Sequence, residues 1–417
     1  MEFSKRLRYL PQVHNQRMDR AYEAAIGKFG QPAIAANNLT IGNPDLPPPQ
    51  GVMDVFARCA AIPDKQGYML PASGSSKLLT AASAFRARKH KIDQMPITHL
   101  CALKGARIGL NNAIEALTDE GDLIALPAWF YPGCLNAVIM AYCKPVFYSV
   151  LPGSDFFTEV QRCFDHAKHD FGKYPRLLLT CPVGNPFCFA LSRSDLKQAV
   201  DYLRPKKTPI LSDEAYIYNP FPGEETVSLM QVPGGPEAGV SLVTFSKMFD
   251  VPSWRLAFAQ GHLGMMEAIR RVDSAGQYGH SYAIEQAAIE AMSGEYDGFP
   301  AECGKNYGLR YQAVISGSAD FDIEVLPAQA GMFAGLVLPA PWAALGSLET
   351  AARFLEHRGK RVNPGCIHGQ EADGLLRLAL VKDVSVVKEV TRDLCEFLLT
   401  DPEQYQVPPD AQSSYIA

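Results

Sequence analysis

Short apolar runs alternate with amphipathic segments through the middle of the chain, and this alternation constrains the fold more than any other feature. The runs "DLIALP", "PRLLLTCP", "TPILSDEAY" and "VSLVTFSK" carry hydrophobic residues at successive positions. A strand that is apolar on both faces must be buried on both faces, as in a parallel sheet with helices on each side. The sequence therefore predicts an α/β fold with a mostly parallel sheet flanked by helices.

The segments between these runs have the spacing of helices. Residues 106–121 show helical periodicity and are expected to end at Gly121. Residues 191–207 begin with a Ser-x-x-Asp pattern, which is typical of a helix start. Helix-like and strand-like segments therefore alternate along the chain, as expected for repeated strand–helix units.

A second region is expected because the chain has 417 residues, more than one compact core usually holds. After about residue 300 the pattern of apolar runs and helices changes. It consists of "FDIEVLPAQAGMFAGLVLP", a helix near 348–357, "LLRLALV" and a final helix near 384–399. We predict a large domain at 51–300. A smaller α+β domain is predicted from an N-terminal arm at 1–50 together with residues 301–417.

Composition excludes several classes of partner. The net charge of −5 gives no general attraction to nucleic acid or to an anionic membrane. The ten cysteines are scattered without a CxxC pair, so a disulfide framework is not expected and a reducing compartment fits better. We expect a cytoplasmic protein, since no apolar run is long enough for a bilayer and the N-terminus is too polar for a signal peptide.

Polar residues follow the apolar runs where each run ends. Asn185 follows one strand, Asp213 and Tyr216 follow the next, and Lys247 follows a third. Chemistry in parallel sheets gathers at the carboxyl ends of the strands. A lysine that forms a Schiff base, a carboxylate that keeps a pyridine ring protonated, and an arginine such as Arg255 for a phosphate together suit bound pyridoxal 5′-phosphate (PLP).

With these residues in order, the sequence resembles the fold-type I PLP-dependent enzymes of the aspartate aminotransferase superfamily, class I/II. The resemblance runs from "IGNPDLPPP" to "LLRLALV". It implies that Lys247 holds the cofactor as an aldimine, that Asp213 meets the ring nitrogen, and that Tyr216 is a catalytic residue that meets the ring oxygen. The other residues it implicates are Asn185 for the ring oxygen, Thr244 and Arg255 for the phosphate, Gly105, Ala106 and Arg107 for the phosphate turn, Tyr131 (or Trp129) for ring stacking, Tyr68 for the neighbouring subunit's phosphate, and Arg377, Asn185 and Gly42 for the substrate.

The function that the resemblance implies is transfer of an amino group between an L-amino acid and a 2-oxo acid, through the Lys247 aldimine and a quinonoid. It also implies a homodimer with shared active sites. The alternative is a PLP-dependent lyase or synthase of the same fold, which would carry out β- or γ-elimination or form carbon–carbon bonds, for example on S-adenosylmethionine. Arg107 in place of a small hydroxyl residue, and "NPFC" in place of Asn-Pro-Thr-Gly, motivate that alternative. A PLP-binding regulator is disfavoured because there is no helix-turn-helix extension and no basic patch.

Structural roles remain open for several of these residues. Lys247 alone could extend to solvent, Asp213 could cap a helix, Arg377 could lie on the surface of an edge strand, and Tyr68 could be an ordinary packed residue. The spacing of Cys163, His166 and His169 invites a metal, but no further ligand pair stands nearby. No metal is predicted.

Overall fold

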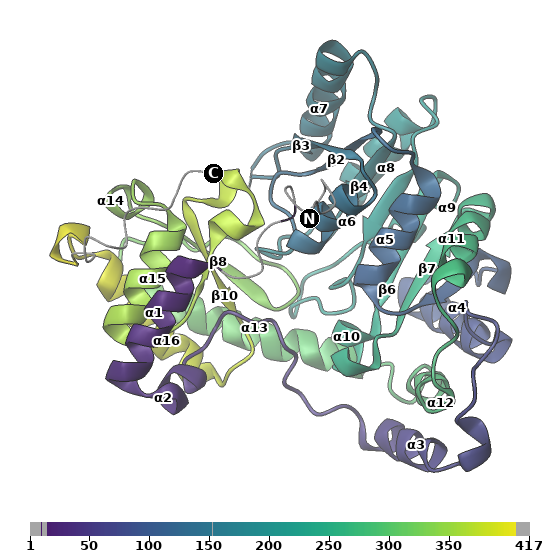
Figure 1. The fold of residues 1–417 in the computed structure, drawn as a ribbon, viewed down its shortest axis with the longest axis horizontal. Coiled ribbons are helices and arrows are strands. Elements are labelled where there is room, and N and C mark those ends of the chain that lie inside the picture. The colour runs from purple at the N-terminus through teal and green to yellow at the C-terminus, as the bar shows by residue number, and fades with distance from the viewer. Residues whose placement is uncertain (1–9, 11–14, 152, 406–417) are drawn as a thin grey trace, which may run out of the picture.

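The computed structural model describes residues 10, 15–151 and 153–405, which form a larger and a smaller sheet surrounded by helices (Figure 1). Residues 1–9, 11–14 and 406–417 of the predicted smaller domain lie outside the described residues. The larger sheet has the strand order β1-β7-β6-β5-β4-β2-β3. Its strands are β1 (Leu100–Leu103), β2 (Leu123–Pro127), β3 (Lys144–Tyr148), β4 (Leu177–Thr180), β5 (Ile210–Asp213), β6 (Gly239–Thr244) and β7 (Ala257–Gly261).

Most of the larger sheet is parallel, which confirms the predicted α/β class. Strands β3, β2, β4, β5 and β6 run in one direction, and β7 runs antiparallel to both β6 and β1. The reversal of β7 has a local cause. The link from β6 folds back on itself, and the Phe245 backbone N–H donates to the Leu256 carbonyl (3.0 Å), so β7 returns beside β6 without a crossover.

Alternate residues of each strand face opposite layers of helices. In β1, Cys101 and Leu103 pack into one core with α5 and α11, while Leu100 and Ala102 pack into another with α4 and α12. Both faces of the sheet are therefore buried, as the apolar strands required. The covering helices are α5 (Ala106–Leu117), α6 (Pro132–Met140) and α11 (Leu263–Gly276) on one face, and α4 (Ser76–His90), α7 (Phe156–Phe171), α8 (Arg193–Leu203) and α12 (Tyr282–Ala291) on the other.

Two helix predictions can be compared with the structure. Ser192 and Asp195 form a reciprocal capping box at the start of α8, as predicted. The predicted end of α5 at Gly121 is wrong, because the helix ends at Leu117. The backbone of Thr118 is extended, and its hydroxyl donates to the Ile114 carbonyl (2.7 Å). A side chain therefore supplies a hydrogen bond to a carbonyl of the last turn, and the helix does not continue.

The smaller sheet is antiparallel, with the order β8-β10-β9, and all three strands lie within residues 333–379. Helix α1 packs against α15, where Arg17 donates to Glu349 (2.8 Å) and Glu356 (2.9 Å). The domain boundaries at residues 50 and 300 stay a prediction. The remaining elements are β8 (Phe333–Val337), β9 (Asn363–Pro364), β10 (Leu375–Ala379), α1 (Gln16–Phe29), α2 (Gln31–Ala36), α3 (Gln50–Ala60), α9 (Gly235–Ala238), α10 (Phe245–Met248), α13 (Phe299–Ser318), α14 (Ala340–Ala343), α15 (Ser347–Arg358) and α16 (Val384–Leu398).

Two further properties bear on the sequence predictions. None of the helices in the described part of the chain has the length and apolar character needed to cross a membrane. All ten cysteines are free thiols.

Candidate active site

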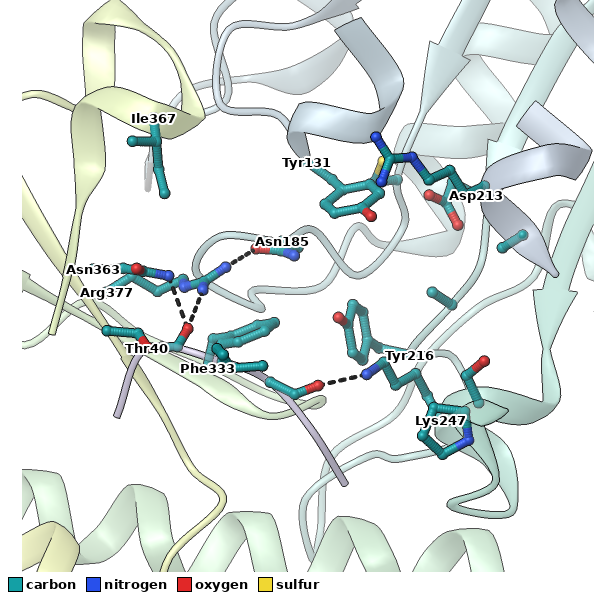
Figure 2. A pocket seen from close by; sticks show the side chains of 18 of the residues that line it. Thr40, Tyr131, Asn185, Asp213, Tyr216, Lys247, Phe333, Asn363, Ile367 and Arg377 are labelled. Carbon is teal, nitrogen blue, oxygen red and sulfur yellow. Dashed lines mark hydrogen bonds between the residues drawn. The ribbon is translucent and has the colours of Figure 1, made fainter. Parts of the chain in front are cut away.

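A cavity of about 660 Å³ lies between the carboxyl ends of the parallel strands and the smaller sheet (Figure 2). Strands β5 and β6 contribute their last residues, β10 contributes a residue from the opposite side, and the segment around residue 41 borders the cavity as well. Most of the predicted site residues line it together: Gly42, Ala106, Arg107, Tyr131, Asn185, Asp213, Tyr216, Thr244, Lys247, Arg255 and Arg377.

Lys247 lies in α10, directly after β6, and its side chain enters the cavity. Its Nζ donates to the Gly42 carbonyl (2.6 Å), the contact drawn in Figure 2. Burial lowers the pKa of Lys247 to about 8; the positive charges of Arg377 and Arg255 add to this effect, and Asp250 opposes it. A larger share of the amine is therefore neutral and nucleophilic at mildly alkaline pH than for an ordinary lysine.

Asp213 ends β5 and points into the same cavity. Burial raises the pKa of its carboxyl to about 7, and a hydrogen bond from the Ala215 backbone N–H only partly opposes this rise. Its Oδ1 has no hydrogen-bond partner among the described residues. A buried carboxylate oxygen without a donor is costly, so Asp213 is well suited to receive a cationic N–H from a bound molecule.

Arg377 sits on β10, the central strand of the smaller sheet, and its side chain is buried. The interpretation of Arg377 as a surface residue on an edge strand is therefore wrong. Its Nη1 donates to Asn185 Oδ1 (2.8 Å) and its Nη2 donates to the Thr40 carbonyl (2.6 Å). The guanidinium also lies 4.0 Å from the centre of the Phe333 ring.

Neutral groups thus hold Arg377 in place, and it has no carboxylate partner in the described part of the chain. Burial lowers the pKa of Arg377 to about 10, so it stays cationic at neutral pH. A positioned, buried guanidinium of this kind is a receptor for a carboxylate.

An anion cradle lies where α5 begins. Gly105 precedes the helix with φ of +90° and no side chain caps the helix start, so the first backbone N–H groups are left for a ligand. Gly105 does not line the cavity itself, but a Cβ there would lie 2.5 Å from Arg255 Nη2. Glycine therefore lets the backbone approach Arg255 closely, and Ala106 and Arg107 of the first turn face the cavity.

Among the aromatic candidates, Tyr131 lines the cavity and Trp129 does not. Trp129 is buried against Phe187 instead, with ring centres 4.9 Å apart. Phe187, one of the departures in "NPFC", thus fills a small core under the site. Tyr68 does not line the cavity of its own chain: it is 83% exposed and packs on Tyr278 with ring centres 4.5 Å apart.

Sequence reasoning missed several residues at the Arg377 end of the cavity. Thr40 supplies the carbonyl that Arg377 binds, and Asn363 Nδ2 donates to the same carbonyl (2.8 Å). Phe333 lies under the guanidinium. Only the position of Thr40 just before Gly42 could have signalled its role, because the backbone carbonyl, rather than the side chain, makes the contact.

Comparisons of sequence and of fold both match this chain to aminotransferases. Residues 36–392 match the sequence profile of the family "Aminotransferase class I and II". AatC of Rhizobium meliloti (strain 1021), a protein with an aminotransferase name, is 30% identical over 97% of both chains. The glutamate-pyruvate aminotransferase AlaC of Escherichia coli (strain K12) is 26% identical over 86% of this chain and 85% of its own. An aminotransferase structure from Staphylococcus aureus shares the fold, with a TM-score of 0.82 and 22% identity over 95% of this chain and all of that one.

The environment of Lys247 leads to a prediction about its reactivity in the cofactor-free protein. The rate at which an amine-directed reagent labels Lys247 should rise with pH and level off above about pH 8, because only the neutral amine reacts. In the unfolded protein the same lysine should still be gaining reactivity near pH 10. Mass spectrometry of the labelled peptide measures both profiles, and identical profiles would contradict the lowered pKa.

Proposed function

Because the chain belongs to the aminotransferase class I and II family, whose members use PLP, we propose that its cavity binds PLP and exchanges an amino group between an L-amino acid and a 2-oxo acid. The protein is an aminotransferase by family membership. What the proposal adds is the assignment of roles to individual residues. The observation that carries it is the convergence of Lys247, Asp213 and Arg377 on one cavity.

The residues present fit this cofactor on three counts. Asp213 Oδ1 is buried without a donor, so it can receive the protonated ring nitrogen. The uncapped start of α5 and the nearby Arg255 together suit a phosphate. The Lys247 amine has a lowered pKa, as required for reaction with an aldehyde.

When bound, the cofactor supplies an aldehyde and an electron-withdrawing ring. Lys247 is assigned the amine that binds this aldehyde and that later moves a proton at the substrate Cα. Its hydrogen bond to the Gly42 carbonyl holds Nζ inside the cavity. Asp213, as an anion paired with the ring nitrogen, keeps that nitrogen protonated. Tyr131 is assigned to the face of the ring, and Asn185 and Tyr216 to its oxygen.

Arg377 is assigned to the α-carboxylate of the amino acid or oxo acid. Two hydrogen bonds fix its guanidinium, to Asn185 and to Thr40, so the substrate carboxylate meets a preset orientation. A fixed carboxylate leaves the substrate less rotational freedom, which helps to direct the bond to be broken toward the Lys247 amine. Asn185 therefore has a second role as a positioning residue for Arg377.

We also propose a homodimer with shared active sites. Exposed apolar side chains support this assembly, since Ile41 at the border of the cavity is 67% exposed and Tyr68 is 83% exposed. Tyr68 lies outside the cavity of its own chain, and we assign it to the phosphate end of a partner's cavity.

The amino-transfer assignment predicts a half-reaction. Purified protein loaded with PLP and given one amino acid, without any oxo acid, should convert its cofactor to the amine form and release one oxo acid per chain. Absorbance follows the cofactor and chromatography follows the oxo acid. Lys247→Ala should abolish this conversion and the borohydride-trappable adduct, because no other lysine lines the cavity in the described part of the chain.

Release of ammonia or of a cleaved product, with the cofactor returned unchanged, would instead support the lyase or synthase alternative. A borohydride-stable adduct that persists in Lys247→Ala would overturn the assignment of Lys247.

The shared-site proposal predicts complementation between two damaged chains. Lys247→Ala is expected to be inactive and Tyr68→Ala to bind the cofactor weakly, but a mixed dimer contains one undamaged site. Random mixing should therefore restore about a quarter of wild-type activity at a cofactor concentration that does not saturate Tyr68→Ala. If the mixture shows only the activity expected from the diluted Tyr68→Ala protein, the shared site is contradicted. Sedimentation of the wild-type protein as a monomer would contradict it as well.

A further inference from the structure

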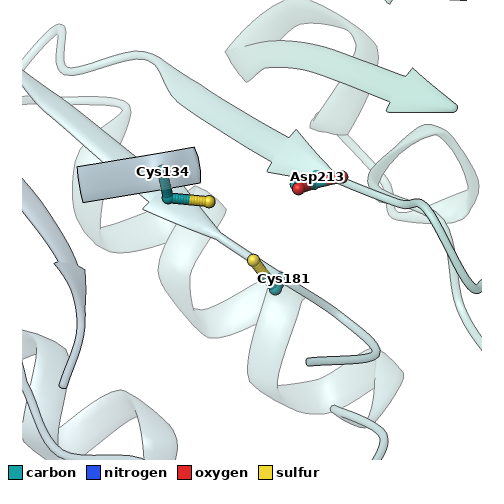
Figure 3. Close-up of side chains that lie close together, drawn as sticks. All are labelled: Cys134, Cys181 and Asp213. Atoms are coloured by element: carbon teal, nitrogen blue, oxygen red, sulfur yellow. The ribbon is translucent and has the colours of Figure 1, made fainter. Parts of the chain in front are cut away.

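Two cysteine thiols lie beside the carboxylate that ends β5. The sulfur atoms of Cys134 and Cys181 and a carboxylate oxygen of Asp213 all lie within 4.8 Å of one another (Figure 3). Across residues 10, 15–151 and 153–405, no other group of three His, Cys, Asp or Glu side chains gathers its ligand atoms this closely. The cluster is thus a distinct feature of the site.

Rigid elements hold the three groups together. Cys134 lies in the first turn of α6, Cys181 follows β4 directly, and Asp213 ends β5. Strands β4 and β5 are paired neighbours, with Thr180 opposite Ser212, so the strand register itself places Cys181 near Asp213. Ligands on helices and strands keep their geometry better than ligands on loops.

The cluster is accessible from the cavity, and one of its oxygen atoms lacks a hydrogen-bond donor. Cys181 and Asp213 line the large cavity, so a small ion can reach them from solvent. Cys134 is fully buried, and a hydrogen bond with Cys181 together with burial raises the pKa of its thiol. Asp213 Oδ1 has no donor in the described part of the chain, so it can accept a cation.

We propose that the cofactor-free protein binds one thiophilic divalent cation, of the Zn²⁺ or Cd²⁺ class, through Cys134, Cys181 and Asp213. Two sulfurs and one oxygen are a donor set that suits these ions, with a fourth position open to water from the cavity. On binding, two metal–sulfur bonds and one metal–oxygen bond form. Each thiol gives its proton to solvent, so two protons are released per metal ion at a pH where Asp213 is ionised.

The site would exclude the cofactor, and this consequence rests on the proposed function. Asp213 is assigned to the ring nitrogen of PLP, and the same carboxylate cannot serve the metal and the ring together. A bound metal therefore blocks cofactor loading, and a bound cofactor blocks the metal. The serine variants of the two cysteines separate the roles, because they remove the metal ligands and leave Asp213 in place.

Cadmium is the probe for the metal site. Titration of cofactor-free protein with Cd²⁺ should produce thiolate-to-metal charge-transfer absorption in the ultraviolet that saturates at one ion per chain. Two protons should be released per ion in weakly buffered solution. Cys134→Ser and Cys181→Ser should each weaken binding at least about tenfold, in line with loss of a direct ligand. Cys59→Ser is the matched control, since Cys59 lies in α3, outside the cluster, and should leave the titration unchanged.

The outcomes that would overturn the site are specific. Unchanged charge-transfer absorption in the Cys134→Ser, Cys181→Ser double variant, or no such absorption in the wild type, would contradict it. Circular dichroism of each variant checks that the fold is retained. A fourth serine variant, at the buried Cys163, tests whether loss of any buried thiol alone lowers the affinity; an equal loss there would also contradict the site.

A second titration tests the exclusion. Protein preloaded with PLP should bind Cd²⁺ at least tenfold more weakly than cofactor-free protein, and Cys134→Ser should load PLP normally in the presence of Cd²⁺. Equal Cd²⁺ affinity with and without PLP would overturn the shared carboxylate. Failure of the protein to take up PLP at all would instead refute the proposed function, while the first titration would still report on the metal site.

Discussion

The fold of this protein brings charged side chains into one cavity and, in the described part of the chain, leaves Asp213, Lys247 and Arg377 without a salt bridge, and the site depends on that arrangement. The adjacent residues Asp213 and Glu214 differ in how their carboxylates are hydrogen-bonded. Glu214 accepts hydrogen bonds from Arg86 (3.2 Å), Ser228 (2.7 Å) and the Leu229 backbone N–H (2.8 Å), so its charge is met within the chain. Asp213, one residue earlier, is also buried and has an oxygen with no donor in the described region. Such a group costs stability unless a ligand supplies the donor.

The same principle organises the rest of the cavity. Asp213 and the start of α5 lie toward the sheet edge, while Arg377 faces them from the smaller sheet, with Lys247 entering from α10 (Figure 2). One end of the cavity therefore offers the Asp213 carboxylate to a bound cofactor, and the other end offers the Arg377 guanidinium to a bound substrate. Neutral oxygens hold Arg377, so its orientation is set without neutralising it. Preset charges of this kind need no rearrangement when a ligand arrives.

The strands and the residues directly after them can be predicted from the sequence, because a strand buried on both faces requires a continuous run of apolar residues. The positions of Asp213 and Lys247 follow from such runs. Contacts between distant segments produce no local sequence pattern. The Thr40 carbonyl accepts from Arg377 across 337 positions, and Cys134 lies near Cys181 because α6 begins beside the end of β4. The reversal of β7 also depends on how a link folds back, which its composition does not reveal.

The stability of an Asp213→Asn variant measures the cost of burying this carboxyl without a donor. A carboxyl whose pKa rises from 3.8 to about 7 on folding favours the folded state while protonated, and this advantage is lost as pH rises through that window. At pH 8 the cofactor-free variant should therefore be more stable than the wild type by on the order of 1–4 kcal/mol, with a smaller difference at pH 5, and should bind PLP more weakly. A variant that is less stable at pH 8 would show that the unpaired carboxyl carries no such cost, and one that binds PLP as tightly as the wild type would show that Asp213 does not hold the cofactor.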